Sequence, residues 1–197
     1  QGRFLTQREH PRMALIVPSI KATTLELRAP GMLRLEIELG LPHPQHSPML
    51  DVQVWDDCVR AYDCDDVTAT WFSNAIGVPC RLVRFHPDVV RATSTTWTGG
   101  VAASTMFADG YPVLIAGSAS LDDVNDKLRA AGREALPMNR FRPNLVIGDI
   151  GAFEEDYAAF LQFGATVLTP VKPCSRCPIP SVDQATGVPG PDPLDVM

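Results

Sequence analysis

The chain has 197 residues, of which 45% are hydrophobic, 20% charged and 7% aromatic. These proportions are close to those of ordinary globular domains, and they exclude a disordered chain, a collagen-like chain or a coiled coil. With 23 acidic and 17 basic residues the formal net charge is −6, which argues against nucleic acid or acidic membranes as partners. No apolar run approaches the roughly 20 residues of a membrane helix, and no signal peptide is visible.

The cysteine, proline and glycine content narrows the class further. Five cysteines are thinly spread along the chain, unlike the dense frameworks of small secreted domains. A reducing compartment is therefore expected, and we predict a cytoplasmic protein. The 18 prolines and 14 glycines favour short strands joined by turns over long helices.

The first part of the chain predicts a β hairpin. Residues 24–28 and 32–39 form its arms, with Pro30-Gly31 as the turn. In the second arm apolar and charged residues alternate strictly, which predicts one buried face and one solvated face. The apolar members of this alternation are Leu33, Leu35, Ile37 and Leu39.

A proline-rich loop, two short strands and a helix are expected next. Residues 41–48 carry three prolines and predict the loop, and residues 52–54 and 81–85 predict the strands. A helix over residues 67–76 is capped by Asp65 or Asp66 and stopped by Gly77. Its buried side should carry Val67, Trp71 and Ala75.

The second part begins after a segment without periodicity, residues 89–106, which predicts a boundary or a long loop. Residues 111–116 predict a buried strand. A helix then opens at Ser120 with Asp123 as the partner in a capping box, and it ends at Gly132. The apolar stripe of this helix is expected to consist of Leu121, Val124, Leu128 and Ala131. Two later strands are expected over residues 144–147 and 165–171.

Cys174-Ser-Arg-Cys177 is the strongest chemical motif. Two cysteines at this spacing can converge on a metal ion or form a redox disulfide, and the arginine between them favours the thiolate. A structural zinc ion needs a second ligand pair, for which Cys58 and Cys64 are candidates at an unusual spacing. The simplest interpretation of the spacing alone is two reduced cysteines in a turn.

Two further segments carry groups suited to ligand binding. Arg142 and Asn144 precede a predicted strand; an arginine fork can bind phosphate, and an asparagine amide offers both a donor and an acceptor. The turn at residues 108–110 exposes backbone amides. Taken alone, the first segment is more often a solvated loop and the second an ordinary Asp-Gly turn.

Other polar residues predict no site. The acidic run at residues 153–156 is interpreted as a solvated turn or a helix start. The four histidines are scattered in loops, so no catalytic dyad or zinc triad is predicted. The sequence lacks a phosphate-binding glycine loop, a nucleophile elbow and a zinc-protease motif.

Taken in order, the motifs resemble one family, the MOSC domain. The nearest group contains the mitochondrial amidoxime reducing component and its bacterial YcbX-like relatives. The segments that carry the resemblance are residues 107–115, 119–123, 141–147 and 171–177, Val182-Asp183 and Thr186-Gly187. Upstream, residues 5–8, Pro11-Arg12, residues 52–57 and Trp71 resemble the later part of the N-terminal β-barrel domain of this group.

The resemblance implies an α+β, β-rich fold, with a MOSC-type β-barrel core and peripheral helices. Residues 1–88 are expected to be the later part of the N-terminal β-barrel domain, and residues 89–197 the MOSC domain. Family members carry a further strand-rich segment before the position of Gln1 and a closing segment after that of Met197. We therefore expect a chain that is truncated at both ends.

The resemblance also implies a molybdenum–molybdopterin cofactor. Cys177 is then the metal ligand and the catalytic residue, with Cys174 as its neighbour, and a thiolate is the soft donor that such a site favours. At two places the sequence departs from the family: Gln184 replaces a proline, and Ala108 and Gly110 replace hydroxyl residues. The expected cofactor-binding residues are Ala108, Asp109, Gly110, Arg142, Asn144, Ser175, Arg176 and Cys177.

The implied reaction is the two-electron reduction of N-hydroxylated compounds, namely hydroxylamines, amidoximes and hydroxylated nucleobases. No motif for flavin, haem or nicotinamide is present, so an electron-transfer flavoprotein, a haem protein or an iron–sulfur protein is expected as a separate partner. The resemblance also carries an association with pyridoxal phosphate. The alternatives are a sulfur- or metal-carrier MOSC module and a zinc-stabilised interaction domain.

Overall fold

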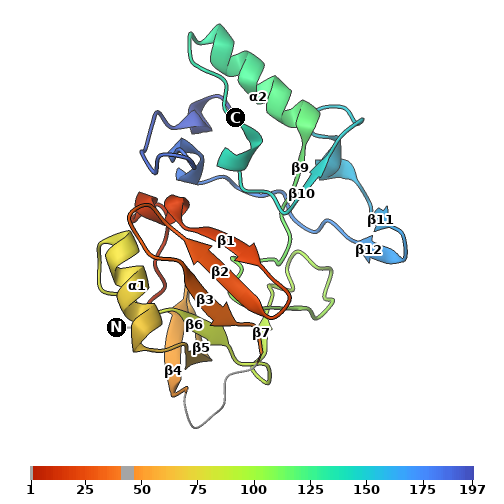
Figure 1. Cartoon of the computed structure of the whole chain (residues 1–197). Helices are drawn as coiled ribbons and strands as arrows, with labels where there is room; N and C mark the ends of the chain where they lie inside the picture. Colours follow the sequence, from red (N-terminus) through yellow and green to blue (C-terminus); the bar gives the residue numbers. More distant parts are fainter. Residues whose placement is uncertain (1, 41–46) are drawn as a thin grey trace. The chain divides into compact units, whose positions relative to one another are not determined.

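The computed structural model describes residues 2–40 and 47–197. It consists of two compact units. The first unit contains Gln1–Arg91 and Val182–Pro189, and the second contains Ala92–Ser181 and Gly190–Met197. The described residues form two α-helices and many short strands (Figure 1), so the predicted β-rich α+β class is confirmed. The predicted domain division between residues 88 and 89 stays a prediction.

The first unit is built from two three-stranded antiparallel sheets and one helix. The sheets have the strand orders β1-β2-β3 and β4-β5-β6. The elements are η1 (Pro11–Leu15), β1 (Val17–Ile20), β2 (Thr24–Arg28), β3 (Leu35–Glu38), β4 (Met49–Val54), β5 (Asp57–Asp63), α1 (Asp66–Ile76) and β6 (Val83–Phe85).

The predicted hairpin is present as β2 and β3, but its second strand is shorter than expected. Gly31 has φ +73°, and the Met32 amide donates to the Ala29 carbonyl at 3.1 Å, as the Pro-Gly turn requires. The strand begins only at Leu35, and Leu33 is 87% exposed, so its predicted burial is wrong. The Leu33 carbonyl instead accepts a hydrogen bond from the Trp71 indole at 2.6 Å, which holds this segment outside the sheet.

Helix α1 confirms the predicted cap and stop. The Asp65 carboxylate accepts the Thr68 amide at 2.6 Å, and Gly77 ends the helix with φ +91°. Trp71 and Ala75 are buried as predicted and form a core cluster with Leu27 of β2, against which Leu35 and Ile37 of β3 pack. Val67 is 73% exposed, so its predicted burial is wrong. Thr68 takes the buried position in that turn, one residue further along the helix.

Two strands of this unit have no counterpart among the predicted elements. Strand β5 pairs with β4 across a two-residue turn in which Trp55 adopts φ +54°. No glycine, asparagine or proline marks that turn, so the usual hairpin signal is missing. Strand β1 contains Pro18, a residue that argues against a strand in sequence reasoning. Residues 41–46 of the predicted proline-rich loop lie outside the described residues.

The second unit contains one helix and short paired strands. Strands β9 and β10 are parallel, with Leu145 opposite Ile115, and β11 and β12 form an antiparallel hairpin. The elements from the unit boundary onward are β7 (Arg91–Ala92), β8 (Ser104–Thr105), β9 (Ile115–Gly117), α2 (Ser118–Ala130), η2 (Met138–Arg140), β10 (Leu145–Ile147), η3 (Glu154–Tyr157), β11 (Leu161–Phe163), β12 (Thr166–Leu168), η4 (Ile179–Ser181) and η5 (Pro193–Asp195).

Helix α2 corrects the predicted capping box. The helix begins at Ser118, two residues early, and its N-cap position is Gly117, which has no side chain to cap with. Ser120 therefore lies inside the first turn. Val124 and Leu128 are buried as predicted, whereas Ala131 is exposed beyond the helix end. No helix in the described part of the chain has the length and hydropathy of a membrane-spanning segment.

Candidate functional site

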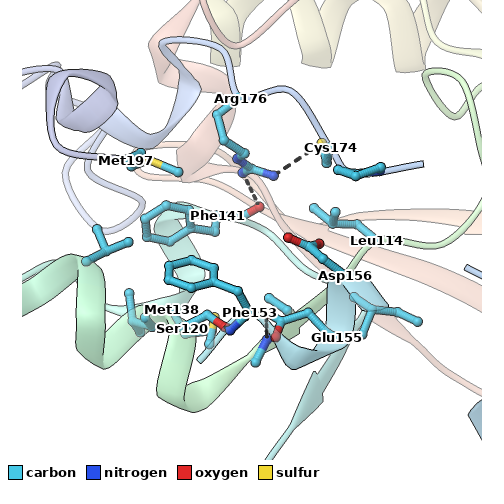
Figure 2. Close-up of a pocket in the computed structure, with 16 residues that line it drawn as sticks. Leu114, Ser120, Met138, Phe141, Phe153, Glu155, Asp156, Cys174, Arg176 and Met197 are labelled. Atoms are coloured by element: carbon cyan, nitrogen blue, oxygen red, sulfur yellow. Dashed lines mark hydrogen bonds between the residues drawn. The ribbon is translucent and has the colours of Figure 1, made fainter. Parts of the chain in front are cut away.

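The second unit contains a cavity of about 190 Å³ at the junction of β9 and α2 (Figure 2). Strand β9 and the first turns of α2 form one wall, and η2 with Phe141 forms another. The remaining walls come from η3 and from Pro173, Cys174 and Arg176. The parallel pairing of β9 with β10 positions the end of β9, and with it the start of α2, at this cavity.

Glu155 caps helix α2 from a distant part of the chain. Its Oε1 accepts the Gly117 amide at 2.8 Å and the Ser120 hydroxyl at 2.6 Å. The Ser120 oxygen in turn accepts the Phe153 amide at 2.8 Å. A Cβ at Gly117 would lie 2.7 Å from Glu155 Oε2 and 2.8 Å from Ser120 Oγ, so any larger residue would have to displace the carboxylate or the hydroxyl. A negative charge is favourable at a helix N-terminus.

Two of the three carboxylates of η3, those of Glu155 and Asp156, have pKa values that are shifted in opposite directions. Burial raises the pKa of Glu155, but the hydrogen bonds from Ser120 and from backbone amides outweigh it, and the pKa lies below its usual range. Burial, followed by the charge of Glu155, raises the pKa of Asp156. Glu155 Oε2 is buried without a partner among the described residues. Asp156 is exposed, so solvent screens the electrostatic influence of Glu155 on its pKa.

Arg176 fixes the cysteine segment to the cavity wall. Its Nη1 donates to the Cys174 sulfur at 3.4 Å, and its Nη2 donates to the Phe141 carbonyl at 2.9 Å (Figure 2). The guanidinium also lies 5.5 Å from the centre of the Phe141 ring. Arg176 Nε is buried and has no partner in the part of the chain that the structure describes. Cys174 is exposed, whereas Arg176 is half-buried.

The other residues of the cysteine motif lie beside the cavity wall rather than in it. Cys177 is half-buried and Ser175 is exposed, and neither lines the cavity. Within residues 2–40 and 47–197 the Cys177 thiol makes no hydrogen bond. The assignment of Cys177 as a metal ligand therefore stays a prediction.

Asn144 and Arg142 differ in how the structure uses them. The side-chain oxygen of Asn144 accepts a hydrogen bond from the Leu114 backbone amide at 2.8 Å, and the backbone amide of Asn144 donates to the Leu114 carbonyl at 2.8 Å, so Asn144 holds a cavity-lining residue in place. Arg142 is exposed and adopts φ +53°, a strained conformation for arginine. Its guanidinium makes no ion pair or hydrogen bond with another described residue.

The predicted turn at residues 108–110 lies outside the cavity. Ala108 is half-buried, and Asp109 and Gly110 are exposed. Among the predicted cofactor-binding residues, Arg176 is the one that lines the cavity, where it is joined by Cys174. The described residues contain no group of three or more His, Cys, Asp or Glu side chains arranged for a metal ion.

Sequence reasoning missed Glu155 and Asp156, which it interpreted as part of a solvated turn. The contacts that define Glu155 join residues 35 and 38 positions apart, so no local pattern reveals them. One indirect signal exists: Gly117 at the start of an amphipathic helix leaves the first amides without a local cap.

Two family models match the chain. The model of the MOSC N-terminal β barrel domain matches residues 1–79, and that of the MOSC domain matches residues 102–196. The chain belongs to the MOSC-domain proteins. The Cys174–Cys177 segment and all the cavity-lining residues except Met197 lie within the residues matched by the MOSC domain.

Relatives of this MOSC protein include mitochondrial amidoxime-reducing components. Component 1 of Mus musculus is 30% identical over 192 residues, covering 95% of this chain and 54% of the relative. Component 2 of Homo sapiens is 31% identical over 190 residues, covering 95% and 55%. The chain thus spans about half the length of these relatives.

A solution structure of a protein from Bordetella bronchiseptica is also similar. The two sequences are 37% identical, and the superposition covers 44% of this chain and 67% of the Bordetella chain, with a TM-score of 0.40. At that score the likeness does not define a shared fold.

Proposed function

We propose that this MOSC protein reduces N-hydroxylated compounds with a molybdenum–molybdopterin cofactor, for which Cys177 supplies the metal ligand. The observation that carries the proposal is the Cys174–Cys177 segment, which Arg176 fastens to the wall of a cavity in the MOSC domain. The names of the relatives support a reductase of the amidoxime-reducing type.

The residues present fit such a cofactor. A cysteine thiolate is a soft donor suited to molybdenum, and guanidinium groups suit the phosphate of the pterin. The Arg142 guanidinium has no partner among the described residues. The Nε of Arg176 is buried and also makes no hydrogen bond with a described residue.

The acidic residues of the cavity limit where the cofactor phosphate binds. Glu155 and Asp156 both line the cavity, and carboxylates repel a phosphate. We therefore assign the phosphate to Arg142 rather than to the cavity. The cavity, next to Cys174, is left for a different ligand.

The chemistry follows from this division of roles. When bound, the cofactor supplies two electrons that, with two protons, convert an N-hydroxyl group to N–H and water. The protein holds the metal through Cys177 and anchors the anionic group through Arg142, while Arg176 keeps the cysteine segment in one conformation. A separate electron-transfer flavoprotein, haem protein or iron–sulfur protein delivers the electrons; its identity, the association with pyridoxal phosphate and the cytoplasmic location stay predictions.

A reductase assay with a chemical electron donor tests the proposal without the unknown partner. Protein isolated with its cofactor is mixed with reduced methyl viologen and benzamidoxime, and benzamidine is quantified by chromatography. We expect the unaltered protein and the Cys174→Ala variant to form benzamidine, and the Cys177→Ala variant to form none. Molybdenum-loaded protein that consumes neither benzamidoxime nor a hydroxylamine would contradict the proposal.

A sulfur-carrier function is the second candidate, because the first cysteine of the motif is exposed and could hold sulfur. Cys174 is exposed, and the Arg176 guanidinium lies 3.4 Å from its sulfur. Mass spectrometry of the protein as isolated distinguishes the two functions. A persulfide on Cys174 without molybdenum supports the carrier, and molybdenum without a persulfide supports the reductase.

A further inference from the structure

The cavity of the MOSC domain combines aromatic walls with unpaired negative charge. The rings of Phe141 and Phe153 line it together with aliphatic side chains. Figure 2 shows the Asp156 carboxylate pointing into the space between these rings and Leu114. An apolar cavity with a few convergent polar groups is the usual form of a small-molecule site.

The negatively charged side chains that line the cavity form no ion pair with the positively charged one. Glu155 uses Oε1 to cap α2, and its buried Oε2 has no partner among the described residues. The Asp156 carboxylate likewise accepts no hydrogen bond and forms no ion pair within the described part of the chain. Among the described residues that line the cavity, Arg176 is the one cation, and two of its nitrogens are bonded to Cys174 and to the Phe141 carbonyl. Lys127 Nζ lies 5.5 Å from the centre of the Phe153 ring, but it is paired with Asp123 at 2.6 Å. A ligand that offers positively charged N–H groups would complete this site.

The size of the cavity limits the ligand. Its volume of about 190 Å³ is below the roughly 300 to 1,000 Å³ of drug-sized pockets, so it suits one ring with a small head group. Flat aromatic walls favour a planar body, and they also favour a delocalised cation.

We propose that this cavity binds a compact aromatic cation whose N–H groups donate hydrogen bonds to the Asp156 carboxylate. An aryl amidinium has this shape, because its two nitrogens match the two oxygens of a carboxylate. The binding claim rests on the cavity alone and needs no molybdenum. A corollary does rest on the proposed function: reduction of a neutral aryl amidoxime yields such a cation, so Asp156 would hold the product more tightly than the substrate.

Calorimetric titration of the cofactor-free protein tests the site with three ligands of nearly equal shape. Benzamidine is cationic, benzamide is neutral and benzoate is anionic. We expect benzamidine to bind, benzamide to bind at least about tenfold more weakly, and benzoate to give no measurable heat. Equal affinity for benzamidine and benzamide would overturn the proposal, because shape alone would then explain the binding.

Two matched variants assign the charge. Asp156→Asn should weaken benzamidine binding by about tenfold or more and leave benzamide binding unchanged. Asp122→Asn removes an equivalent charge from an exposed position of α2 and should leave both affinities unchanged. An Asp156→Asn variant that melts no lower than the unaltered protein and keeps full affinity for benzamidine would refute the role of Asp156. Since no electron donor or molybdenum is used, failure here leaves the reductase proposal standing, and failure of the reductase assay leaves this site standing.

Discussion

Replacing Glu155 with alanine should destabilise the second unit, although Glu155 lies in a short 3₁₀ segment remote in sequence from the helix that it caps. The carboxylate accepts the Gly117 amide at 2.8 Å and the Ser120 hydroxyl at 2.6 Å. It thereby replaces the cap that a glycine N-cap cannot provide.

The expected magnitude follows from three contributions. Two hydrogen bonds to a charged group are worth about 1.5 to 3 kcal/mol each, and the charge at the helix N-terminus adds about 0.3 to 1 kcal/mol. The buried, unpartnered Oε2 opposes them with a desolvation cost of about 1 to 3 kcal/mol. We therefore expect Glu155→Ala to lower the free energy of unfolding by about 3 kcal/mol, the middle of the resulting range and somewhat more than the roughly 0.5 to 2 kcal/mol of an ordinary helix cap.

Urea denaturation, followed by circular dichroism, measures this loss. Glu154→Ala is the matched control, because Glu154 is exposed and its carboxylate accepts only the Gly151 amide within its own turn, at 2.9 Å. The control should change the free energy of unfolding by about 0.5 kcal/mol or less. Equal destabilisation by the two variants would refute the capping role of Glu155.

The pH dependence gives a second check of the same contact. The pKa of Glu155 is lowered in the folded state, so its stabilisation is fully present above the usual glutamate value of about 4.3. It should be lost as the pH falls through the lowered folded-state value. The difference between the unaltered protein and Glu155→Ala should therefore shrink in acid, and a difference that grows in acid would contradict the assignment.

Four further predictions concern other contacts of the two units. Gly117→Ala should cost about 1 to 3 kcal/mol, because its Cβ would lie 2.7 Å from Glu155 Oε2 and 2.8 Å from Ser120 Oγ; the share of the cost that is due to Glu155 should vanish in a Glu155→Ala background, and a double-mutant cycle measured by urea denaturation would show it. Asp65→Ala should lower the free energy of unfolding of the first unit by about 1 kcal/mol through loss of the α1 cap; an unchanged midpoint would show that the Thr68 amide needs no acceptor. Asp156→Asn should slightly stabilise the protein at neutral pH, because the raised pKa of Asp156 means that folding disfavours its charged form. This gain in stability should disappear below about pH 4, the usual range of the aspartate pKa. Thermal melts at neutral pH that show no gain would contradict the pKa shift. Arg142→Ala should weaken cofactor affinity by roughly ten- to a hundredfold without lowering the thermal midpoint; unchanged molybdopterin content would show that Arg142 is only a surface charge.

Short-range signals determined which parts of the fold could be predicted. Asp65 and Gly77 bracket helix α1 as expected, and Pro30-Gly31 makes the expected turn, since each signal acts within four residues. Four side chains that the sequence predicts to be buried are exposed: Leu33, Leu39, Val67 and Ala131. All four lie near the ends of a strand or helix. In the first unit those limits depend on packing against Trp71 and its neighbours, which periodicity does not record.

The residues of the candidate site also fall into those that the sequence reveals and those that it does not. The cysteine motif is visible in sequence because its members are adjacent, and the structure brings Cys174 and Arg176 to the cavity. Glu155 and Asp156 could not be found, because their importance arises from a cavity whose walls join β9, η3 and the cysteine segment. An acidic run in a turn looks solvated until the helix that it caps is known.

The molybdenum content of three proteins tests the central claim most directly. The unaltered protein, Cys174→Ser and Cys177→Ser are produced in the same molybdenum-replete host, and metal per polypeptide is measured by mass spectrometry after gel filtration. Serine preserves size but replaces the soft sulfur donor with a hard hydroxyl. The proposal predicts molybdenum in the unaltered protein and in Cys174→Ser, and its loss from Cys177→Ser in a protein that still melts cooperatively. Molybdenum retained by Cys177→Ser and lost from Cys174→Ser would contradict the assignment and identify the cavity-lining cysteine as the ligand.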